Sequence, residues 1–394
     1  MPSVVLFTCE LVNPGGHERL MVREARYFKS RGFDVKLLVF KLDKRALFGY
    51  KDLNIEILKS KSKIGKIILL RKKLKKLKPD LVIAQSYWDA ELLYLATLFT
   101  KIPYITHLHG TPFWFDNRLD LRKYGFIFRD VFDEIRNSLY GHREFIPKNP
   151  KISLKDKFIL NIMATLNYVA VRKSKKIITL TNQLKWEIRK MYGKDAIVSR
   201  GCLDPEILNY TPSRDIKKEL NLEGSRIILS VGRLDRRKRI DILIKAFSKL
   251  YEKYGDIYLL IGGVGEEEEN LKSLAKDLGV DDRVIFLGYI PEEDLFDYYA
   301  SCDVFAFPSW TTSGITPYEA LAVGSKVVWT SEADEPVLSD PHVFIADPTV
   351  DDFARALERA LNTNVEIETD LSQYTWNMYF EKVYKACIDV IGNK

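Results

Sequence analysis

Short runs of hydrophobic residues alternate along the chain with longer segments in which hydrophobic residues recur at helical spacing. The short runs predict strands buried in a parallel sheet, and the longer segments predict amphipathic helices. In the first half the pattern predicts strands at 3–9, 34–40, 81–85, 103–109, 176–181 and 196–199, and helices at 17–31, 64–77, 88–100 and 182–192. A strand, a loop ending in Gly15 and Gly16, a helix and a second strand thus open a doubly wound α/β domain.

The alternation begins again after Ser225, which predicts a second sheet. Its expected strands are 226–231, 257–261, 283–287, 303–308 and 326–329, and its expected helices are 240–251, 266–278, 292–300 and 315–323. Residues 200–206 have the composition of a linker. Because 394 residues exceed one ordinary hydrophobic core, two domains are expected.

The stretch from Asp303 to Gly324 combines a buried strand, a hydroxyl-rich loop at 309–314 and a helix that ends at Gly324. Free backbone N–H groups and the positive end of a helix dipole would meet at this loop, and both favour a phosphate. Glu319, one turn inside the helix, would reach a neutral hydroxyl beside that phosphate. The alternative is an ordinary α/β crossover, which has the same outline.

A second anion site is predicted where the strand 226–231 ends. Gly232 is followed by the sequence RLDRRKR, so four or more cations precede a helix. Arginine offers a bidentate fork and lysine a point charge, and both suit a diphosphate.

Two histidines, His107 and His109, are expected on one face of a strand end, because side chains alternate along a strand. The pair is compatible with a metal ion, but no third ligand of a suitable type is nearby in sequence. A single histidine facing a cleft is the preferred interpretation, since ligands in open α/β sheets bind beyond the carboxyl ends of strands. His109, directly before Gly110, is the better candidate.

Charge is unevenly divided between the halves. Residues 1–205 hold 40 Lys+Arg and 20 Asp+Glu, a balance of +20, and residues 206–394 hold the remaining 21 and 34, a balance of −13. A basic half favours an anionic partner, such as nucleic acid, an anionic membrane surface or a phosphorylated acceptor. The segment 111–157 mixes aromatic and basic residues, and it is either a membrane-facing or acceptor-facing surface or the core of a small helical insertion.

The four cysteines have no paired spacing, which is typical of reduced residues in a cytosolic protein. No signal peptide is apparent, and the apolar stretch 158–171 is too short to span a bilayer. Abundant Lys and Glu with only three glutamines favour a heat-adapted source.

Five ordered segments of the second half closely resemble glycosyltransferase family 4. They are Gly232-Arg-Leu with Lys238, Ile-Gly-Gly-Val-Gly at 261–265, Arg-Val-Ile-Phe-Leu-Gly-Tyr at 283–289, Ala-Ser-Cys-Asp-Val-Phe-Ala-Phe-Pro-Ser at 300–309, and Gly-Ile-Thr-Pro-Tyr-Glu-Ala-Leu-Ala-Val-Gly at 314–324. The resemblance reaches the first half through the Gly-Gly loop, His109 and the closing helix after Trp376. It implies the GT-B fold, in which two Rossmann-like doubly wound domains face each other across a cleft.

The resemblance also implies roles. Residues 1–205, with a crossover helix at 376–394, would bind the acceptor, and residues 206–375 would bind the donor. Arg233 and Lys238 would hold the donor diphosphate and neutralise the leaving group, and His109 would lie beside the donor sugar; these three are the catalytic candidates. Glu319 would bind ribose hydroxyls, and 287–290 would border the base. The further donor-binding candidates are Gly15, Gly16, Gly288, Tyr289, Ile290, Gly314, Ile315 and Thr316.

The implied enzyme is a retaining hexosyltransferase that uses a nucleoside-diphosphate sugar, UDP- or GDP-linked. No Asp-x-Asp triplet occurs in the sequence, so the cations would stabilise the departing diphosphate, and transfer is expected without a metal or other cofactor. The acceptor is expected to be a glycan or a lipid-linked, anionic molecule, reached at the inner membrane face by a cytoplasmic protein through its basic domain. Nucleic acid is not an expected partner. The alternatives are a synthase of a soluble glucoside or storage polymer, of trehalose or glycogen type, and a non-catalytic nucleotide-sugar-binding protein.

Three departures from the family pattern cluster where the sugar would lie. Thr311 occupies the position of a glutamate eight residues before Glu319, followed by Thr-Ser where Gly-Phe is common. Arg200-Gly201 replaces Asn-Gly, and the sequence EADEP at 332–336 replaces a Gly-Gly loop. An unusual donor sugar or an unusual acceptor is therefore expected.

Overall fold

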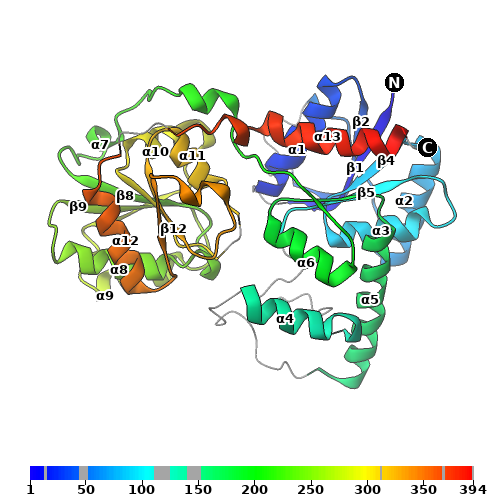
Figure 1. The fold of residues 1–394 in the computed structure, drawn as a ribbon, viewed down its shortest axis with the longest axis horizontal. Helices are drawn as coiled ribbons and strands as arrows, with labels where there is room; N and C mark the ends of the chain where they lie inside the picture. Colours follow the sequence, from blue (N-terminus) through cyan, green and yellow to red (C-terminus); the bar gives the residue numbers. More distant parts are fainter. Residues whose placement is uncertain are drawn as a thin grey trace. The chain divides into compact units, whose positions relative to one another are not determined.

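The computed structural model describes residues 1–12, 16–43, 52–110, 125–139, 152–310, 313–365 and 369–392. The chain divides into two compact units (Figure 1). Unit 1 comprises Met1–Arg200 and Asn377–Lys394, and unit 2 comprises Gly201–Trp376. Each unit is a parallel sheet with helices on both faces, so the predicted α/β doubly wound fold is confirmed.

Unit 1 is built on a seven-stranded sheet with the order β3-β2-β1-β4-β5-β6-β7, in which all paired strands are parallel. The strands are β1 (Ser3–Leu11), β2 (Asp34–Leu42), β3 (Ile55–Ile57), β4 (Leu81–Ala84), β5 (Tyr104–Leu108), β6 (Ile177–Thr179) and β7 (Ile197–Val198). The helices are α1 (Gly16–Ser30), α2 (Lys63–Leu77), α3 (Tyr87–Thr97), α4 (Arg129–Leu139), α5 (Leu154–Lys173), α6 (Asn182–Tyr192) and α13 (Trp376–Gly392). Ser62, Ser86, Ser153 and Thr181 cap α2, α3, α5 and α6 with their hydroxyls.

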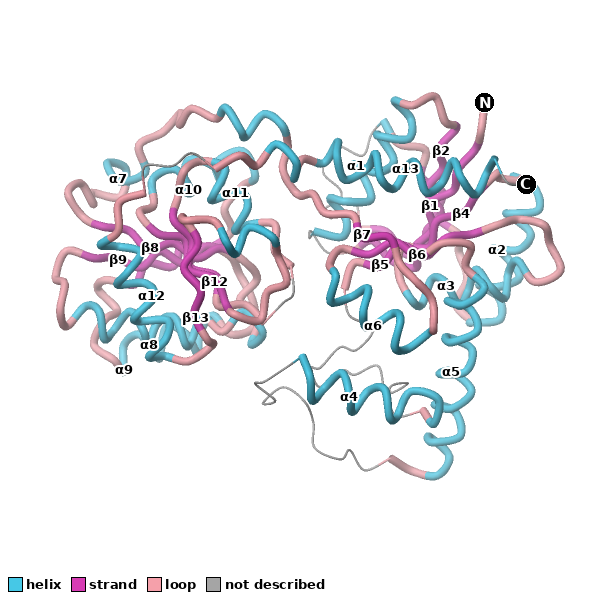
Figure 2. Tube along the Cα trace, viewed as in Figure 1, coloured by secondary structure: helices cyan, strands magenta, loops and turns pink. Residues whose placement is uncertain are grey.

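The last helix, α13, returns to unit 1 and lies beside α1 (Figures 1 and 2). The ring of Tyr27 on α1 packs against that of Phe380 on α13, with centroids 5.6 Å apart and an interplanar angle of 35°. The chain segments that lead into and out of unit 2 are paired with each other: Cys202 N donates to Tyr374 O at 2.8 Å, and Trp376 N donates to Leu203 O at 2.8 Å. The two connections between the units are therefore a short parallel ribbon.

Unit 2 has a six-stranded parallel sheet with the order β10-β9-β8-β11-β12-β13. The strands are β8 (Arg226–Val231), β9 (Ile257–Gly262), β10 (Val284–Gly288), β11 (Val304–Phe307), β12 (Lys326–Thr330) and β13 (Val343–Ala346). The helices are α7 (Ile216–Glu219), α8 (Ile240–Tyr251), α9 (Glu268–Asp277), α10 (Glu292–Ser301), α11 (Thr316–Ala322) and α12 (Val350–Asn362).

The period-two pattern of β11 explains the two helical layers of unit 2. Val304 and Ala306 belong to the hydrophobic core that contains α8, α9 and α12. Phe305 points to the opposite face, where its ring meets that of Tyr299 on α10 with centroids 5.3 Å apart. Figure 2 shows α8, α9 and α12 on one side of the sheet and α10 and α11 on the other. Both faces of the strand are thus covered, which accounts for its unbroken apolar sequence.

In both sheets the strand order reverses between the first strand and the fourth, that is, between β1 and β4 in unit 1 and between β8 and β11 in unit 2. Ligands of open α/β sheets bind beyond the carboxyl ends of the strands at such a switch point. The segments that follow these four strands are therefore where functional side chains are expected.

The structure differs from the prediction in several elements. In the irregular region 111–157, α4 and the start of α5 are helical, as for an insertion, while 111–124 and 140–151 lie outside the described residues. The hydrophobic pattern gave no prediction for β3, α7, β13 or α12, and the stretch 158–171 was not assigned as a helix, although α5 contains it. Among the described residues, no helix combines the length and hydrophobicity that crossing a bilayer requires.

Candidate functional site

The loops at the carboxyl ends of β8, β9 and β10 pack backbone against backbone. Gly263 has a φ of +122°, and a Cβ there would lie 1.9 Å from the carbonyl oxygen of Gly232. A Cβ on Gly265 would lie 2.2 Å from the carbonyl oxygen of Leu234. Gly263 N also donates to Gly288 O at 2.6 Å. Only glycine fits at positions 263 and 265 after β9, because the backbone there packs directly against the backbone of the segment that begins with Gly232.

The predicted cation Lys238 lies at the switch point of unit 2. Its Nζ is 5.2 Å from the ring centroid of Phe307, the last residue of β11. The same Nζ is 3.8 Å from the place that a Cβ on Gly232, directly after β8, would occupy. The ammonium group therefore lies where β8 and β11 both end, the position at which a sheet of this order binds ligands.

The environment of Lys238 makes its positive charge costly. Burial lowers the pKa of Lys238 to about 8, the carboxylate of Asp235 raises it, and the charges of Arg237 and Arg233 lower it. A dianionic diphosphate beside the amine would stabilise the charged form. Arg233, directly after Gly232, is exposed and adds a guanidinium group at the end of β8.

Two of the cations that follow Gly232 are paired with carboxylates of unit 2. Arg237 donates to Asp235 Oδ2 at 2.9 Å. Arg239 is buried, and its guanidinium group bonds to Glu332 at 2.5 Å and 3.3 Å. A buried guanidinium group requires a paired carboxylate, so Arg239 supports the fold and is not a ligand group.

The same contact explains one departure from the family pattern. In the loop 332–336, Glu332 holds Arg239, and Glu335 accepts a hydrogen bond from the hydroxyl of Tyr318 at 2.9 Å. Both carboxylates are buried against side chains of unit 2. Carboxylates that replace the usual Gly-Gly loop thus have structural partners.

The predicted phosphate loop folds onto the end of β11. A Cβ on Gly314 would lie 2.9 Å from Cε1 of Phe307, so only glycine fits without displacing the ring. Trp310 N donates to Arg237 O at 2.8 Å, which joins this loop to the loop after β8. Gly314 and Lys238 therefore lie against the same ring, and the structure brings the two predicted anion sites together.

The helix that follows, α11, is shorter than predicted. Glu319 is buried, and its Oε2 accepts a hydrogen bond from the hydroxyl of Tyr299 at 3.3 Å. Ile315 precedes the helix and makes no side-chain cap. Thr316 Oγ1 is buried without a hydrogen-bond partner among the described residues. A hydroxyl at the start of α11 is therefore available to a ligand.

The residues predicted to border a base lie at the end of β10. Gly288 has a φ of +67°, Tyr289 is exposed, and Ile290 is buried. A Cβ on Gly262 would lie 2.5 Å from Cδ1 of Ile290, so this isoleucine packs closely against the end of β9. Tyr289 thus presents an exposed aromatic side chain at this edge of the sheet.

His109 follows β5 in unit 1. Its Nε2 lies 2.8 Å from Oε1 of Gln85, which follows β4, and its ring centroid is 4.3 Å from that of His107. His107 is fully buried, with Nδ1 3.2 Å from Glu24 and Nε2 2.5 Å from the hydroxyl of Tyr379. The two histidines share one side of the strand, as predicted, and their Nε2 atoms are engaged with protein side chains. Within the described ranges there is no group of three or more side chains arranged to hold a metal ion.

The predicted site residues therefore form two groups. Arg233, Lys238, Gly288, Tyr289, Ile290, Gly314, Ile315, Thr316 and Glu319 lie at the carboxyl edge of the unit 2 sheet, whereas His109 lies at that of the unit 1 sheet. Gly16 is the first residue of α1. Gly15 and Thr311 lie outside the described residues.

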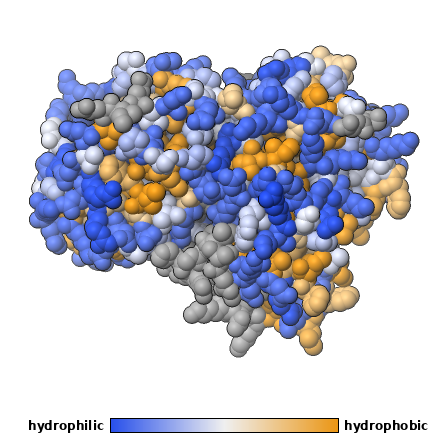
Figure 3. Space-filling view, viewed as in Figure 1, coloured by the Kyte–Doolittle hydropathy of each residue, from blue (hydrophilic) through white to orange (hydrophobic). Residues whose placement is uncertain are grey.

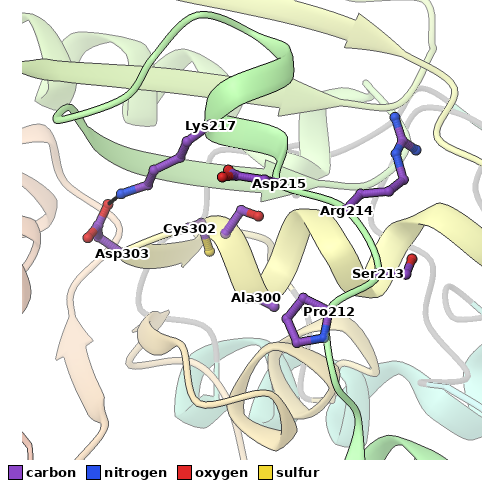
Figure 4. A pocket seen from close by; sticks show the side chains of 9 residues that line it. Pro212, Ser213, Arg214, Asp215, Lys217, Ala300, Cys302 and Asp303 are labelled. Carbon is purple, nitrogen blue, oxygen red and sulfur yellow. Dashed lines mark hydrogen bonds and ion pairs between the residues drawn. The ribbon is translucent and has the colours of Figure 1, made fainter.

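A cavity of about 600 Å³ lies elsewhere in unit 2 and is lined by Pro212–Asp215, Lys217 and residues 300–303 (Figure 4). It adjoins Asp303, which precedes β11, so it is at the amino ends of the strands. Lys217 points toward Asp303, and their Nζ and Oδ2 atoms are 2.9 Å apart. Arg214 is paired with Glu219. The charges of this cavity thus neutralise one another, and the predicted site is at the opposite edge of the sheet.

Sequence reasoning missed several residues that position the candidates. The sequence predicted Phe307 only as a residue of a buried strand, although its ring contacts both Lys238 and Gly314. Glu24 stands in the buried stripe of α1 with Met21 and Phe28, and an acidic residue in an apolar stripe was a usable signal.

Two family models match the chain in succession. Residues 14–201 match the model described as Glycosyltransferase Family 4, and residues 212–378 match the model described as Glycosyl transferases group 1. An uncharacterized glycosyltransferase of Methanocaldococcus jannaschii is 27% identical over 252 residues, which are 58% of this chain and 64% of that protein. The chain thus spans less than two thirds of the curated relatives that head the comparison.

Two solved structures are similar over nearly their whole length. A glycosyltransferase from Rickettsia africae is 19% identical, with 100% of this chain and 99% of that chain covered and a TM-score of 0.72. The HepE protein of Anabaena, solved in complex with UDP, is 16% identical, with coverage of 100% and 98% and a TM-score of 0.69. At these identities the likeness establishes the fold, which is GT-B.

Proposed function

We propose that this chain, which belongs to glycosyltransferase family 4 with its group 1 donor domain, transfers a hexose from a nucleoside-diphosphate sugar to an acceptor with retention at the anomeric carbon. The observation that carries the proposal is the position of Lys238 at the β8–β11 switch point, against the ring that also supports Gly314. One charge and one glycine loop converge there, and both suit a diphosphate.

The chemistry follows from charge. Cleavage of a sugar–diphosphate bond builds negative charge on the departing oxygen, and fixed cations aimed at that oxygen lower the barrier. Arg233 and Lys238 supply this stabilisation, so the transfer needs no divalent ion. Thr316 Oγ1 and the N–H groups around Gly314 offer further hydrogen bonds to the phosphates, and Glu319 accepts from a ribose hydroxyl. UDP is the first nucleotide to test because the Anabaena relative was solved with UDP.

The acceptor is proposed to be anionic or lipid-linked, and an exposed stripe on α5 supports a membrane-side location. Leu154, Phe158 and Ile162 recur every fourth residue and are 84%, 68% and 55% exposed. Phe126, which precedes α4, is 79% exposed, and its backbone N donates to the side chain of Asn161 on α5 at 2.6 Å. Figure 3 shows hydrophobic side chains gathered at the lower end of unit 1, where α5 begins.

Exposed lysines flank this stripe at positions 155 and 157. Apolar side chains bordered by cations suit the interface of an anionic bilayer. Sedimentation with phosphatidylglycerol and phosphatidylcholine vesicles at two salt concentrations tests this step. We expect salt-sensitive binding to the anionic vesicles that is lost in Phe158→Ser and retained in Phe99→Ser, an exposed phenylalanine elsewhere in unit 1. Equal binding to both vesicle types would favour a soluble acceptor.

The transferase itself is tested by a thermal-shift screen of UDP-, GDP- and ADP-sugars, with and without EDTA. The sugar that stabilises the protein is then incubated with polyprenyl phosphates and with neutral sugars, and the product is examined by NMR. We expect transfer with the donor's anomeric configuration and no loss of activity in EDTA. Donor binding without consumption would instead support a non-catalytic nucleotide-sugar-binding protein.

A further inference from the structure

We propose that Glu24, acting through Gln85, holds His109 in the neutral tautomer that carries its proton on Nε2. Glu24 and Gln85 are positioning residues. The tautomer follows from the structure alone, and only its use in sugar transfer rests on the proposed function. The four side chains Glu24, Gln85, His107 and His109 form one continuous chain of contacts with Tyr379 at its far end. Glu24 lies on α1 and Tyr379 on α13, His107 lies in β5, and Gln85 and His109 directly follow β4 and β5, so four segments of unit 1 contribute to the arrangement.

The chain of contacts begins at a carboxylate with two donors. Glu24 is fully buried, Gln85 Nε2 donates to its Oε2 at 2.6 Å, and His107 Nδ1 lies 3.2 Å from its Oε1. An ionised carboxylate only accepts hydrogen bonds. The amide nitrogen of Gln85 must therefore face Glu24, which fixes the orientation of the amide group.

That orientation determines the proton on His109. With its nitrogen facing Glu24, Gln85 presents Oε1 to His109 Nε2 at 2.8 Å. A carbonyl oxygen cannot donate, so Nε2 of His109 must carry the hydrogen. In the neutral ring the lone pair is then on Nδ1, the nitrogen able to accept a hydrogen bond from a sugar hydroxyl.

The neighbouring histidine is also held in one tautomer. The ring centroids of His107 and His109 are 4.3 Å apart, so His107 is part of the immediate surroundings of His109. His107 donates from Nδ1 to Glu24, and its Nε2 accepts the hydroxyl proton of Tyr379 at 2.5 Å. Burial and the charge of Glu24 raise the pKa of Tyr379 well above its ordinary value, so this hydroxyl keeps its proton.

The far end of the chain of contacts is also fixed. Tyr379 is fully buried on α13, and its backbone carbonyl accepts a hydrogen bond from Ser199 Oγ at 2.7 Å. Tyr379 follows Trp376, the last residue of unit 2, by three positions. The tautomer of His109 is thus tied to the segment by which the chain re-enters unit 1.

The test is long-range ¹H–¹⁵N NMR of the full chain with ¹⁵N-labelled histidine at pH 7.5, without any nucleotide sugar. The chain has five histidines, so single His→Gln variants assign the signals. We expect the Nε2–H pattern for His109 and the Nδ1–H pattern for His107. In Glu24→Gln and Gln85→Met the His109 signal should shift toward a mixture of tautomers, while melting temperature and circular dichroism report whether each variant is folded.

Tyr384→Phe is the matched control, because Tyr384 lies on the same helix and contacts other rings. Its His109 pattern should equal that of the wild type. The proposal is overturned if wild-type His109 is protonated on Nδ1 or on both nitrogens, or if both folded variants keep the wild-type pattern. Since no substrate is present, this outcome is independent of whether the protein transfers a sugar. If transfer is observed, the same two variants should lower kcat more than they raise KM for the donor.

Discussion

The ammonium group of Lys238 lies 5.2 Å from the centroid of the Phe307 ring. This contact joins the ends of β8 and β11, which are adjacent in the sheet although β11 begins 73 positions after β8 ends. Burial lowers the pKa of this lysine to about 8. The charge that a diphosphate needs is therefore lost just above neutral pH, which makes ligand binding dependent on pH in a defined direction.

The affinity for UDP should fall as the pH rises through the pKa of Lys238. At pH 9 roughly a tenth of the lysine is charged when its pKa is about 8, so the Kd should be weaker than at pH 7.5 by up to about tenfold. Because a bound diphosphate raises the pKa of Lys238 in the complex, the fall in affinity begins at the pKa of the free protein and continues up to the pKa of the complex. Isothermal titration calorimetry from pH 7.5 to 9.5 measures it. Lys238→Arg, which stays charged, should show a flatter profile, and parallel profiles for the two proteins would contradict the assignment.

Gly263→Ala should destabilise unit 2 by at least about 2 kcal/mol. Its φ of +122° disfavours any L side chain, and its Cβ would lie 1.9 Å from a carbonyl oxygen. Gly255→Ala is the matched control, since a Cβ there meets nothing within 4 Å, and it should change stability by less than about 0.5 kcal/mol. Urea unfolding of both variants compares them. Equal midpoints would show that the loop after β9 relaxes freely.

Substitution of Glu332 by alanine should leave the buried guanidinium group of Arg239 without its carboxylate partner and destabilise unit 2. Arg239 and Glu332 are 1% and 6% exposed, and loss of one partner of such a pair typically costs about 3–5 kcal/mol. Asp351→Ala breaks an exposed pair with Lys249 and should cost less than about 1 kcal/mol. Thermal unfolding distinguishes the two. A small effect of Glu332→Ala would mean that water or another group satisfies Arg239.

Asp89 should make unit 1 less stable as the pH rises from 4 to 7. Its carboxyl group is buried and accepts hydrogen bonds from Cys9 N at 2.8 Å and from the hydroxyl of Ser86 at 2.7 Å. Burial raises the pKa of Asp89 from 3.8 to about 6, against the lowering effect of these hydrogen bonds. The folded state therefore holds its proton more tightly than the unfolded state, and stability from this group is lost as the pH rises through 6.

The measurement for Asp89 is the difference in unfolding free energy between the wild type and Asp89→Asn across pH 4–8. Relative to the variant, the wild type should lose about 3 kcal/mol over this range, which is the shift from 3.8 to about 6 expressed as free energy. A difference that is constant with pH, or that grows in favour of the wild type as the pH rises, would rule out this behaviour.

Much of the fold could be predicted because glycines and charged residues end its elements abruptly. The predicted bounds of β8 and α8 agree with the structure, since Gly232 and the cations separate an apolar run from a helical period. The helix α5 was missed for a physical reason. Its apolar residues near the start are exposed, and Asn167 is buried because it bonds to Glu91 at 2.7 Å. Burial there depends on a partner 76 residues away, which periodicity does not reveal.

The sequence predicted which residues belong to the candidate site but not which of them contact one another. Lys238 and Gly314 could be assigned to two anion-binding segments from sequence, whereas their common contact with Phe307 follows only from the strand order. Likewise, the pairing of Arg239 with Glu332 across 93 positions decides which cations remain for a ligand. Such pairings arise from the sheet topology and leave no local signal.

In the proposed mechanism, Arg233 and Lys238 hold the diphosphate of the donor. Calorimetric titration of UDP, GDP and ADP into the wild type, Arg233→Ala, Lys238→Met and the surface control Lys249→Ala tests it most directly. We expect one of the nucleotides to bind the wild type and Lys249→Ala alike, and to bind each of the other two variants at least about tenfold more weakly, because each has lost a charge-assisted contact. Unchanged affinity in both Arg233→Ala and Lys238→Met would contradict it.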